Sequence, residues 1–236
     1  MGSASARRLQ LIIFVMLGAA AILVAGLMAT GNLAPDRLVV GGDTRPGAGV
    51  PGRTADSVEA FTKAHGNPPD ATYGRIRIPA ISVDAPLTHR TVPKNAEAMP
   101  DPSGPTDVAY YDMSAWPGLG GKPGAGHNAI FAGHVDLRRE IAYAGGVLYQ
   151  GPAVFWLLED LKAGDTIEVT VAGGTPLKYA VVSVKELSAS AKTDWSTIWS
   201  GDVKKDTVTL FTCGGAFDAA SHEYTTRVVV RAERVG

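Results

Sequence analysis

Cys213 is the residue in this chain most suited to covalent chemistry. It is the only cysteine among the 236 residues, so it cannot form an intrachain disulfide. A thiol attacks a carbonyl carbon as its thiolate, and cysteine is mostly protonated near neutral pH, so efficient attack needs a nearby base or cation. The alternative is a small buried hydrophobic residue, which is what most free cysteines are. The residues around Cys213 have to decide between the two.

The local pattern predicts that Cys213 lies at the end of a strand. Residues 207–212, Thr-Val-Thr-Leu-Phe-Thr, favour a strand, and the glycines Gly214 and Gly215 after the cysteine favour a turn. A side chain at a strand end can face a cleft, whereas one in mid-strand is more often packing material. We therefore interpret Cys213 as a thiol presented to a substrate.

His134 is the preferred candidate for the base. It follows the apolar run 129–132, Ala-Ile-Phe-Ala, through Gly133, which again places a functional group where a strand ends. His127 precedes the same run and is the alternative base. The other histidines, which we expect in solvated or loop positions, are His65, His89 and His222.

Arg227 opens the predicted C-terminal strand, 227–232, and can supply positive charge. Alternation places Arg227 and Val229 on one face of that strand. A guanidinium there can donate two hydrogen bonds to the oxyanion that forms when a thiol attacks a carbonyl. The alternative for Arg227, and still more for Arg231, is a surface charge at a strand edge.

The elements that must position these residues are mainly strands. From Tyr73 onward, short runs rich in β-branched residues alternate with Gly, Pro and Asp, as in a β-sandwich or barrel. The clearest predicted strands are 74–78, 129–132, 166–171, 179–184, 207–211 and 227–232. No long 3.6-residue periodicity follows residue 70, so we expect an all-β domain over 72–236.

The N-terminus carries the pattern of a membrane anchor. Residues 9–28 are apolar or small except Gln10, which is long enough to span the hydrocarbon core of a bilayer as a helix. Arg7 and Arg8 precede this segment, so the positive-inside rule predicts that residues 1–8 are cytoplasmic and the remainder is extracellular. A cleavable signal peptide is the alternative, and it also exports the domain.

Residues 29–71 resemble a tether. They are rich in Gly, Pro, Ala and charged residues and can bury little apolar surface, so we expect residues 1–70 to contribute little to a core. Within them, 55–65 is weakly amphipathic and fits a short helix or a solvated linker turn equally well.

Charge and metal-ligand patterns give no sign of nucleic-acid binding or of a metal site. The net charge is -1 with acidic and basic residues nearly balanced, so the chain shows no basic face for nucleic acid. The sequence shows no cluster of metal ligands with recognisable spacing.

Three motifs together resemble the sortase family. Thr-Leu-Phe-Thr-Cys at 209–213 is similar to the Thr-Leu-X-Thr-Cys signature of sortases, and Ala-Gly-His at 132–134 is similar to their histidine segment. Arg227 stands fourteen positions after Cys213, near where sortases place their arginine. Residues 128–136 and 212–218 resemble the actinobacterial class F type, with class E as its neighbour.

The resemblance implies a closed eight-stranded β-barrel with short helices in its loops. It also implies a cysteine transpeptidase that cleaves a Leu-Pro-X-Thr-Gly sorting signal between Thr and Gly. Cys213 would form a thioester, His134 would act as acid and base, and Arg227 would stabilise oxyanions. The acceptor would be an amine of peptidoglycan or of a pilin, and the protein that bears the sorting signal would be the other partner.

The resemblance also implies minor roles around the site. Thr212, Gly214 and His222 are candidate substrate-binding residues, and Asp136 is a candidate orienting group for the histidine. No cofactor is expected; some sortases bind calcium, but the sequence indicates no place for it here.

Two other functions remain as alternatives. An L,D-transpeptidase is also an exported cysteine enzyme, but it would need a Ser-X-Gly-Cys-Arg motif, whereas here Thr212 precedes Cys213 and Gly214 follows it. A tethered β-barrel binding module with a packed cysteine would explain the strands without any catalysis.

Overall fold

The computed structural model describes residues 53–96, 99–190, 193–218 and 223–236. Its strands are β1 Gly74–Ile78, β2 Val83–Thr91, β3 Val108–Asp112, β4 Asn128–Ala132, β5 Asp136–Ile141, β6 Val147–Pro152, β7 Thr166–Val171, β8 Leu177–Ser188, β9 Thr207–Asp218 and β10 Glu223–Arg234. Its helices are α2 Arg53–His65 and α3 Trp195–Trp199, with 3-10 turns η1 Pro79–Ile81, η2 Ala142–Ala144 and η3 Leu158–Asp160.

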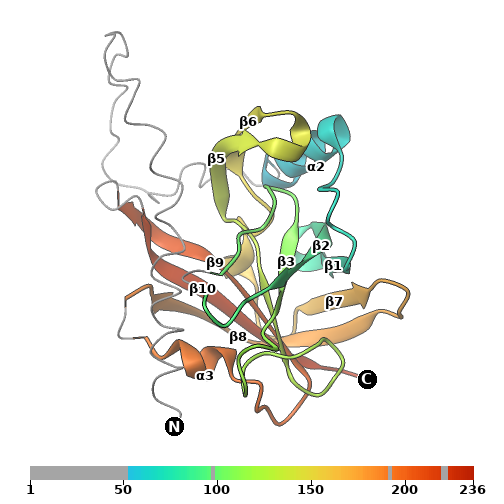
Figure 1. The fold of residues 1–236 in the computed structure, drawn as a ribbon, viewed down its shortest axis with the longest axis vertical. Coiled ribbons are helices and arrows are strands. Elements are labelled where there is room, and N and C mark those ends of the chain that lie inside the picture. Colours follow the sequence, from blue (N-terminus) through green and yellow to red (C-terminus); the bar gives the residue numbers. More distant parts are fainter. Residues whose placement is uncertain (1–52, 97–98, 191–192, 219–222) are drawn as a thin grey trace.

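Eight of these strands close into a barrel. Their order is β1-β2-β3-β4-β9-β10-β8-β7, and β1 also pairs with β7, which closes the ring (Figure 1). The pairs β2–β3 and β4–β9 are parallel, and the other pairs are antiparallel. The expected all-β, closed eight-stranded barrel is confirmed.

Alternate residues of the barrel strands fill its interior. The inward side chains are almost entirely apolar, and they include Ile76, Ile78, Phe131, Ile167, Val169, Leu210, Val228 and Val230. The residues between them face outward, where the short helix α3 covers β9 and β10 with two stacked tryptophans. Trp199 lies 4.8 Å from the ring of Phe211 in β9. The outer face of β9 and β10 is therefore a second packed layer and a firm support for side chains further along these strands.

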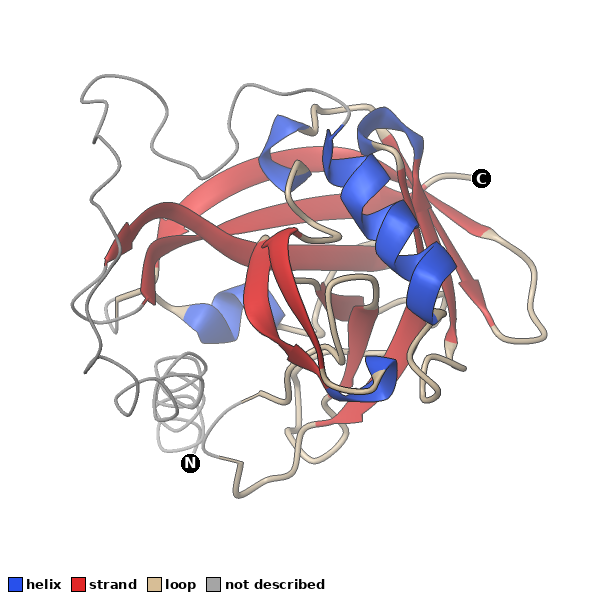
Figure 2. Cartoon of the chain, turned by 90° about the horizontal axis from the view of Figure 1, so that it is seen from above, coloured by secondary structure: helices blue, strands red, loops and turns tan. Residues whose placement is uncertain are grey.

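Strands β5 and β6 form a separate two-stranded sheet outside the barrel, which the sequence patterns did not predict. Helix α2 packs against this sheet, because Phe61 contacts the rings of Tyr149 at 5.1 Å and Tyr143 at 6.3 Å (Figure 2). Phe61 is buried. The second half of the expected tether is thus an ordered helix that belongs to the folded domain, and the expectation that residues up to 70 contribute little is wrong for α2.

Strand β9 continues past the predicted turn at Gly214. It runs on to Asp218 and pairs with β10, which begins at Glu223, so Cys213 and Arg227 lie within long strands instead of at a strand end and a strand start. The register shifts between Tyr224 and Thr226, and Gly215 adopts a φ of 74°. A glycine in this left-handed region permits a β-bulge, which explains why the glycines bend the ladder and do not end it.

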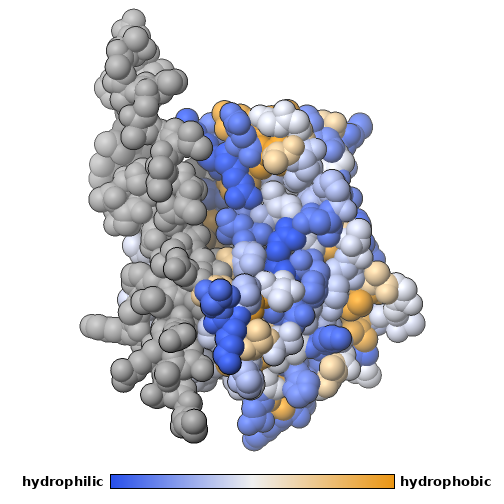
Figure 3. Space-filling model, in the orientation of Figure 1, coloured by the Kyte–Doolittle hydropathy of each residue, from blue (hydrophilic) through white to orange (hydrophobic). Residues whose placement is uncertain are grey.

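The predicted membrane helix, 9–28, lies outside the described residues, as does most of the tether. The described helices are too short or too polar to cross a bilayer. The face of the molecule seen in Figure 3 is mostly hydrophilic, and its hydrophobic areas are small. Some of the exposed apolar side chains belong to β6, at Val147 and Leu148.

Candidate active site

The three candidate catalytic residues lie on three neighbouring strands or their ends. In the parallel pair β4–β9, Ala132 lies beside Phe211, and in the antiparallel pair β9–β10, Cys213 lies opposite Arg227. Since β9 is hydrogen-bonded to both β4 and β10, Cys213 occupies the middle strand.

The chain just after β4 keeps its place beside β9 up to the histidine. The backbone N–H of Gly133 donates to the carbonyl of Phe211 at 3.4 Å, and the Thr212 hydroxyl donates to the carbonyl of Gly133 at 2.8 Å. The next residue, His134, therefore comes beside Cys213. A side chain at Gly133 would place its Cβ 2.7 Å from Val154 and from Phe155, so only glycine allows this approach.

Alternation then places the side chains of Cys213 and Arg227 on the outer face of the barrel. Thr212 and Val228 are paired and lie on the inner side, so their neighbours Cys213 and Arg227 point outward. His134 is two residues beyond the outward-facing Ala132. The sequence order His, Cys, Arg thus becomes a row of three groups, one from each adjacent strand.

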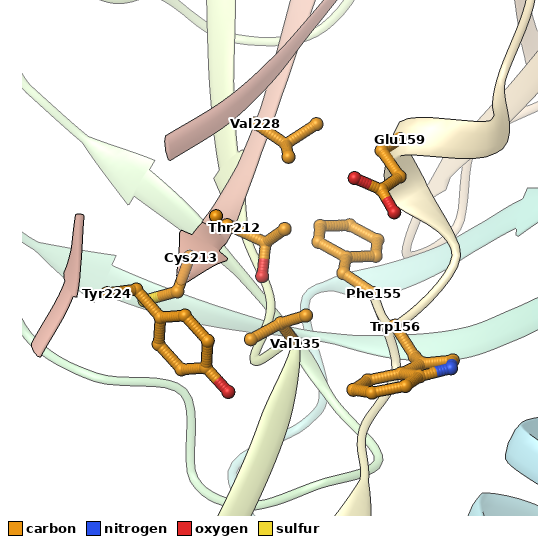
Figure 4. Close-up of a pocket in the computed structure, with 10 residues that line it drawn as sticks. Val135, Phe155, Trp156, Glu159, Thr212, Cys213, Tyr224 and Val228 are labelled. Carbon is orange, nitrogen blue, oxygen red and sulfur yellow. The ribbon is translucent and has the colours of Figure 1, made fainter. Parts of the chain in front are cut away.

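Cys213 borders a small pocket near the end of the barrel. The thiol packs with Val135, Trp156 and Tyr224 and is partly exposed. Figure 4 shows the cysteine beside the tyrosine ring, with Phe155 and Trp156 across the pocket. The wall is mainly apolar, which suits the side chains of a peptide substrate.

The imidazole of His134 is held in its neutral form. Burial of the ring and the positive charge of Arg139 lower the pKa of His134 to about 3, and the nearby carbonyl of Pro102 offsets only part of this effect. Its Nε2 atom is buried and makes no hydrogen bond within the part of the chain that the structure describes. A neutral ring with an unoccupied nitrogen can accept a proton from a thiol.

This shift gives an expected pH dependence of stability. Between about pH 6.5 and pH 3 the unfolded chain protonates the imidazole and the folded chain does not, so the folded state loses about 1.4 kcal/mol per pH unit as the pH falls. His134→Gln removes this contribution. Urea unfolding of both proteins, from about pH 7 to pH 4.5, should show the free energy of unfolding of the wild type falling more steeply. Equal slopes would contradict the buried neutral imidazole. Protonation of the buried carboxylates affects both proteins alike, so its effect cancels from the comparison.

Arg227 is 4% exposed, and its guanidinium is anchored to the first residues of β10. Its Nη1 donates to the carbonyl of Tyr224 at 3.0 Å and to that of Thr226 at 2.8 Å. Both bonds use Nη1, and the guanidinium carries further N–H donors on Nε and Nη2. The geometry suits an oxyanion donor, because the cation is already desolvated and oriented.

Asp136 does not take the expected place beside the imidazole. It is the first residue of β5, and its carboxylate accepts a hydrogen bond from the Tyr224 hydroxyl at 2.7 Å. The reason is topological, since the chain leaves the barrel after β4 and Asp136 belongs to the outer sheet. The orienting role that sequence reasoning gave Asp136 toward His134 is therefore wrong as a direct contact.

The candidate substrate-binding residues have different fates. The hydroxyl of Thr212 is buried on Gly133 and ties β9 to the histidine segment, which is a structural role. Gly214 borders the thiol pocket. His222 lies outside the described residues.

His127 lies at the other end of β4 from the thiol. It precedes the strand, and its Nδ1 is 3.1 Å from the carbonyl oxygen of Gly201. His134 stands seven positions later, roughly 20 Å along an extended chain. This position favours His134 as the base.

Tyr224 is a residue of the site that sequence reasoning missed, as are the pocket residues Phe155 and Trp156. It is 8% exposed and touches the thiol pocket, yet no pattern in the sequence marks it, because it precedes the predicted strand. The available signal was an aromatic residue three positions before Arg227. Among the described residues, no three His, Cys, Asp or Glu side chains converge in a way that could hold a metal ion.

Comparison with known proteins identifies similar chains. A family model described as the sortase domain matches residues 76–235. Curated proteins show no significant match. The chain is similar to the lid mutant of sortase A from Corynebacterium diphtheriae, with 25% identity over 78% of this chain and 80% of that one and a TM-score of 0.49.

Two further solved structures are similar over most of the chain. Streptococcus pneumoniae sortase C is 17% identical over 70% of this chain and 66% of that one, with a TM-score of 0.48. The Clostridium perfringens sortase D5 transpeptidase is 17% identical over 78% of this chain and 98% of that one, with a TM-score of 0.46. The three structures are sortases of different classes, so they do not assign a class to this chain.

Proposed function

This chain belongs to the sortase family of cysteine transpeptidases, and on that premise we propose that it transfers sorting-signal proteins to a surface amine. The sorting signal is of the Leu-Pro-X-Thr-Gly kind, and cleavage falls between Thr and Gly. The observation that carries the proposal is that Cys213 on β9 lies opposite Arg227 on β10 and beside the segment just after β4 that carries His134. A rigid barrel holds these groups in place before substrate binds, as electrostatic catalysis requires.

The first half of the reaction forms a thioester. The neutral imidazole of His134 accepts the thiol proton, and the sulfur of Cys213 attacks the threonine carbonyl of the peptide. Arg227 donates to the oxyanion of the tetrahedral intermediate. The imidazolium then gives its proton to the leaving glycine nitrogen, the C–N bond breaks, and the thioester remains on Cys213.

The second half returns the enzyme to its resting state. An incoming amine attacks the thioester carbonyl, and His134 accepts a proton from the nitrogen. Arg227 stabilises the second oxyanion, the C–S bond breaks, and the thiolate regains the proton. The acceptor is an amine of the peptidoglycan cross-bridge or stem, or a pilin lysine.

The location proposed for this reaction is the outer face of the cell membrane. Residues 9–28 act as a single-pass anchor with residues 1–8 in the cytoplasm, and the barrel lies outside. We assign the chain to class F, with class E as its neighbour, on the segments 128–136 and 212–218.

A mixture experiment tests the proposed function. A protein of residues 53–236, which keeps α2, is incubated with a library of sorting-signal peptides and with glycine or lysine amines. We expect products in which the peptide ends at threonine and carries the added amine, identified by mass. Hydrolysis or no reaction with every peptide and amine, from a folded protein, would refute the transpeptidase with this substrate class.

His134→Ala and His127→Ala in the same assay decide which histidine acts. Loss of a general acid–base costs about 100- to 10,000-fold in rate. We expect this loss in His134→Ala alone, because His127 lies at the opposite end of β4. A reversed result would assign the role to His127.

A further inference from the structure

Tyr224 contacts Cys213, Arg227 and the segment that follows His134. Its ring borders the thiol pocket and packs with Val135, Trp156 and Cys213. Figure 4 shows the ring next to the cysteine, with its hydroxyl pointing away from the strand. The side chain is 8% exposed, so its position is set by packing.

The polar groups of Tyr224 reach the other two catalytic segments. Its hydroxyl donates to Oδ2 of Asp136 at 2.7 Å, and Asp136 stands two residues after His134. Its backbone carbonyl accepts a hydrogen bond from Nη1 of Arg227 at 3.0 Å. One residue therefore contacts the thiol, the histidine segment and the arginine.

The sheets themselves do not make this connection. Asp136 begins β5, which belongs to the two-stranded sheet, whereas Tyr224 and Arg227 belong to β10 of the barrel. As far as the structure describes them, β5 and β10 share no ladder of backbone hydrogen bonds. In addition, the bulge at Gly215 interrupts the β9–β10 register beside Tyr224. A side-chain hydrogen bond is what spans the gap.

The bond is suited to a fixed geometry. A hydrogen bond from a hydroxyl to a carboxylate is shorter and stronger than one between neutral groups. Burial and the Asp136 carboxylate both raise the pKa of Tyr224, so its hydroxyl remains a donor across the working pH range. The phenol ring has only two rotatable bonds, so little conformational entropy opposes the bond.

We propose that Tyr224 is a positioning residue. Its hydrogen bond to Asp136, which we call the clasp, links the His134 segment to the strand of Arg227 and so holds both groups at their working distances from Cys213. The proposal rests on the transpeptidase function proposed above. The clasp leaves the chemistry to the three catalytic residues. Its effect therefore falls on kcat, because displaced catalytic groups slow the chemical steps more than they weaken peptide binding.

The test is a double-mutant cycle in the full-length chain in detergent. Tyr224→Phe removes only the hydroxyl, and Asp136→Ala removes only its acceptor. We expect each to lower kcat about 10-fold with KM little changed, and the double variant to be no worse than either single one. Asp136→Asn keeps an amide oxygen as acceptor and should recover most of the rate.

A matched control separates the clasp from a general loss of a tyrosine hydroxyl. Tyr143→Phe removes a hydroxyl that lies 3.1 Å from Thr106 Oγ1, outside the thiol pocket. We expect this variant to keep the wild-type kcat. Additive losses in the double variant, or a loss confined to KM, would overturn the positioning role and make Tyr224 part of the binding wall.

A second readout needs no substrate, so it still tests the clasp if the sorting-signal reaction fails. Cys213 is alkylated with iodoacetamide and with a bulky fluorescein iodoacetamide, and the ratio of the two rates is compared among variants. Release of the ring in Tyr224→Phe or Asp136→Ala should raise the relative rate of the bulky reagent several-fold. An unchanged ratio overturns the clasp, and the ratio is insensitive to thiol basicity because both reagents share one chemistry.

Discussion

Cys213→Ala is expected to abolish transpeptidation and the formation of any acyl-enzyme. The chain contains no other thiol, and the step that Cys213 performs is the formation of a covalent bond, which alanine cannot replace. Loss of a catalytic nucleophile costs on the order of a million-fold in kcat in enzymes where it has been measured. Mass spectrometry of the protein after incubation with peptide detects the thioester directly, and a product assay gives the residual rate.

The loss should be chemical and not structural. Cys213 is only partly exposed and packs with three neighbours, so alanine leaves a small cavity with a cost of about 1 kcal/mol. We expect Cys213→Ala to unfold cooperatively near the wild-type temperature and to retain peptide binding, because the pocket wall is intact. A folded variant that still transfers peptide to an amine would remove Cys213 from the mechanism.

The proximity of the candidate residues follows from local sequence and strand order. Strands 74–78 and 166–171 match β1 and β7, since each has alternating or β-branched residues between clear turn signals. The parallel and antiparallel pairing of β9 then brings its neighbours' residues beside Cys213. The motifs around His134, Cys213 and Arg227 named these candidates, and the fold shows that their segments are neighbours.

Two barrel strands were missed for physical reasons. β2 contains Pro86, which usually argues against a strand, and here Pro86 pairs with Arg75 of β1. β3 is buried on both faces, between the barrel core and the outer layer under α3, so its residues do not alternate between apolar and polar. Periodicity cannot detect a strand of that kind.

The outer sheet and the clasp could not be predicted from local patterns. β5 carries charged residues such as Arg139, whose guanidinium bonds the carbonyls of Pro102 and Ser103 across a loop. Such a strand depends on tertiary contacts and not on its own hydrophobicity. The Tyr224–Asp136 hydrogen bond joins residues 88 positions apart, and neither residue type indicates the other.

Arg227→Ala is expected to lower kcat and kcat/KM together by about 100- to 1000-fold, equivalent to about 2.7 to 4 kcal/mol of transition-state stabilisation. The guanidinium is opposite Cys213 and already fixed on two carbonyls, so it gains most when the substrate oxygen becomes an oxyanion. Substrate binding in the ground state should change little.

Arg227→Lys should recover only part of the rate. Lysine keeps the positive charge but has no planar pair of donors, and it cannot bind the Tyr224 and Thr226 carbonyls while it also reaches the oxyanion. The lysine variant also separates charge from burial, because it leaves a cation in the same site and limits the structural cost of the substitution.

Arg231→Ala is the matched control for this prediction. Arg231 lies on the same strand and the same face, roughly 14 Å further along, and its Nη2 donates to the carbonyl of Ile198 at 3.0 Å. Its removal costs a half-buried hydrogen bond but should leave kcat unchanged. Steady-state kinetics on the folded variants decide the assignment: if Arg227→Ala only raises KM, or if Arg231→Ala is the more damaged enzyme, the oxyanion donor is another residue.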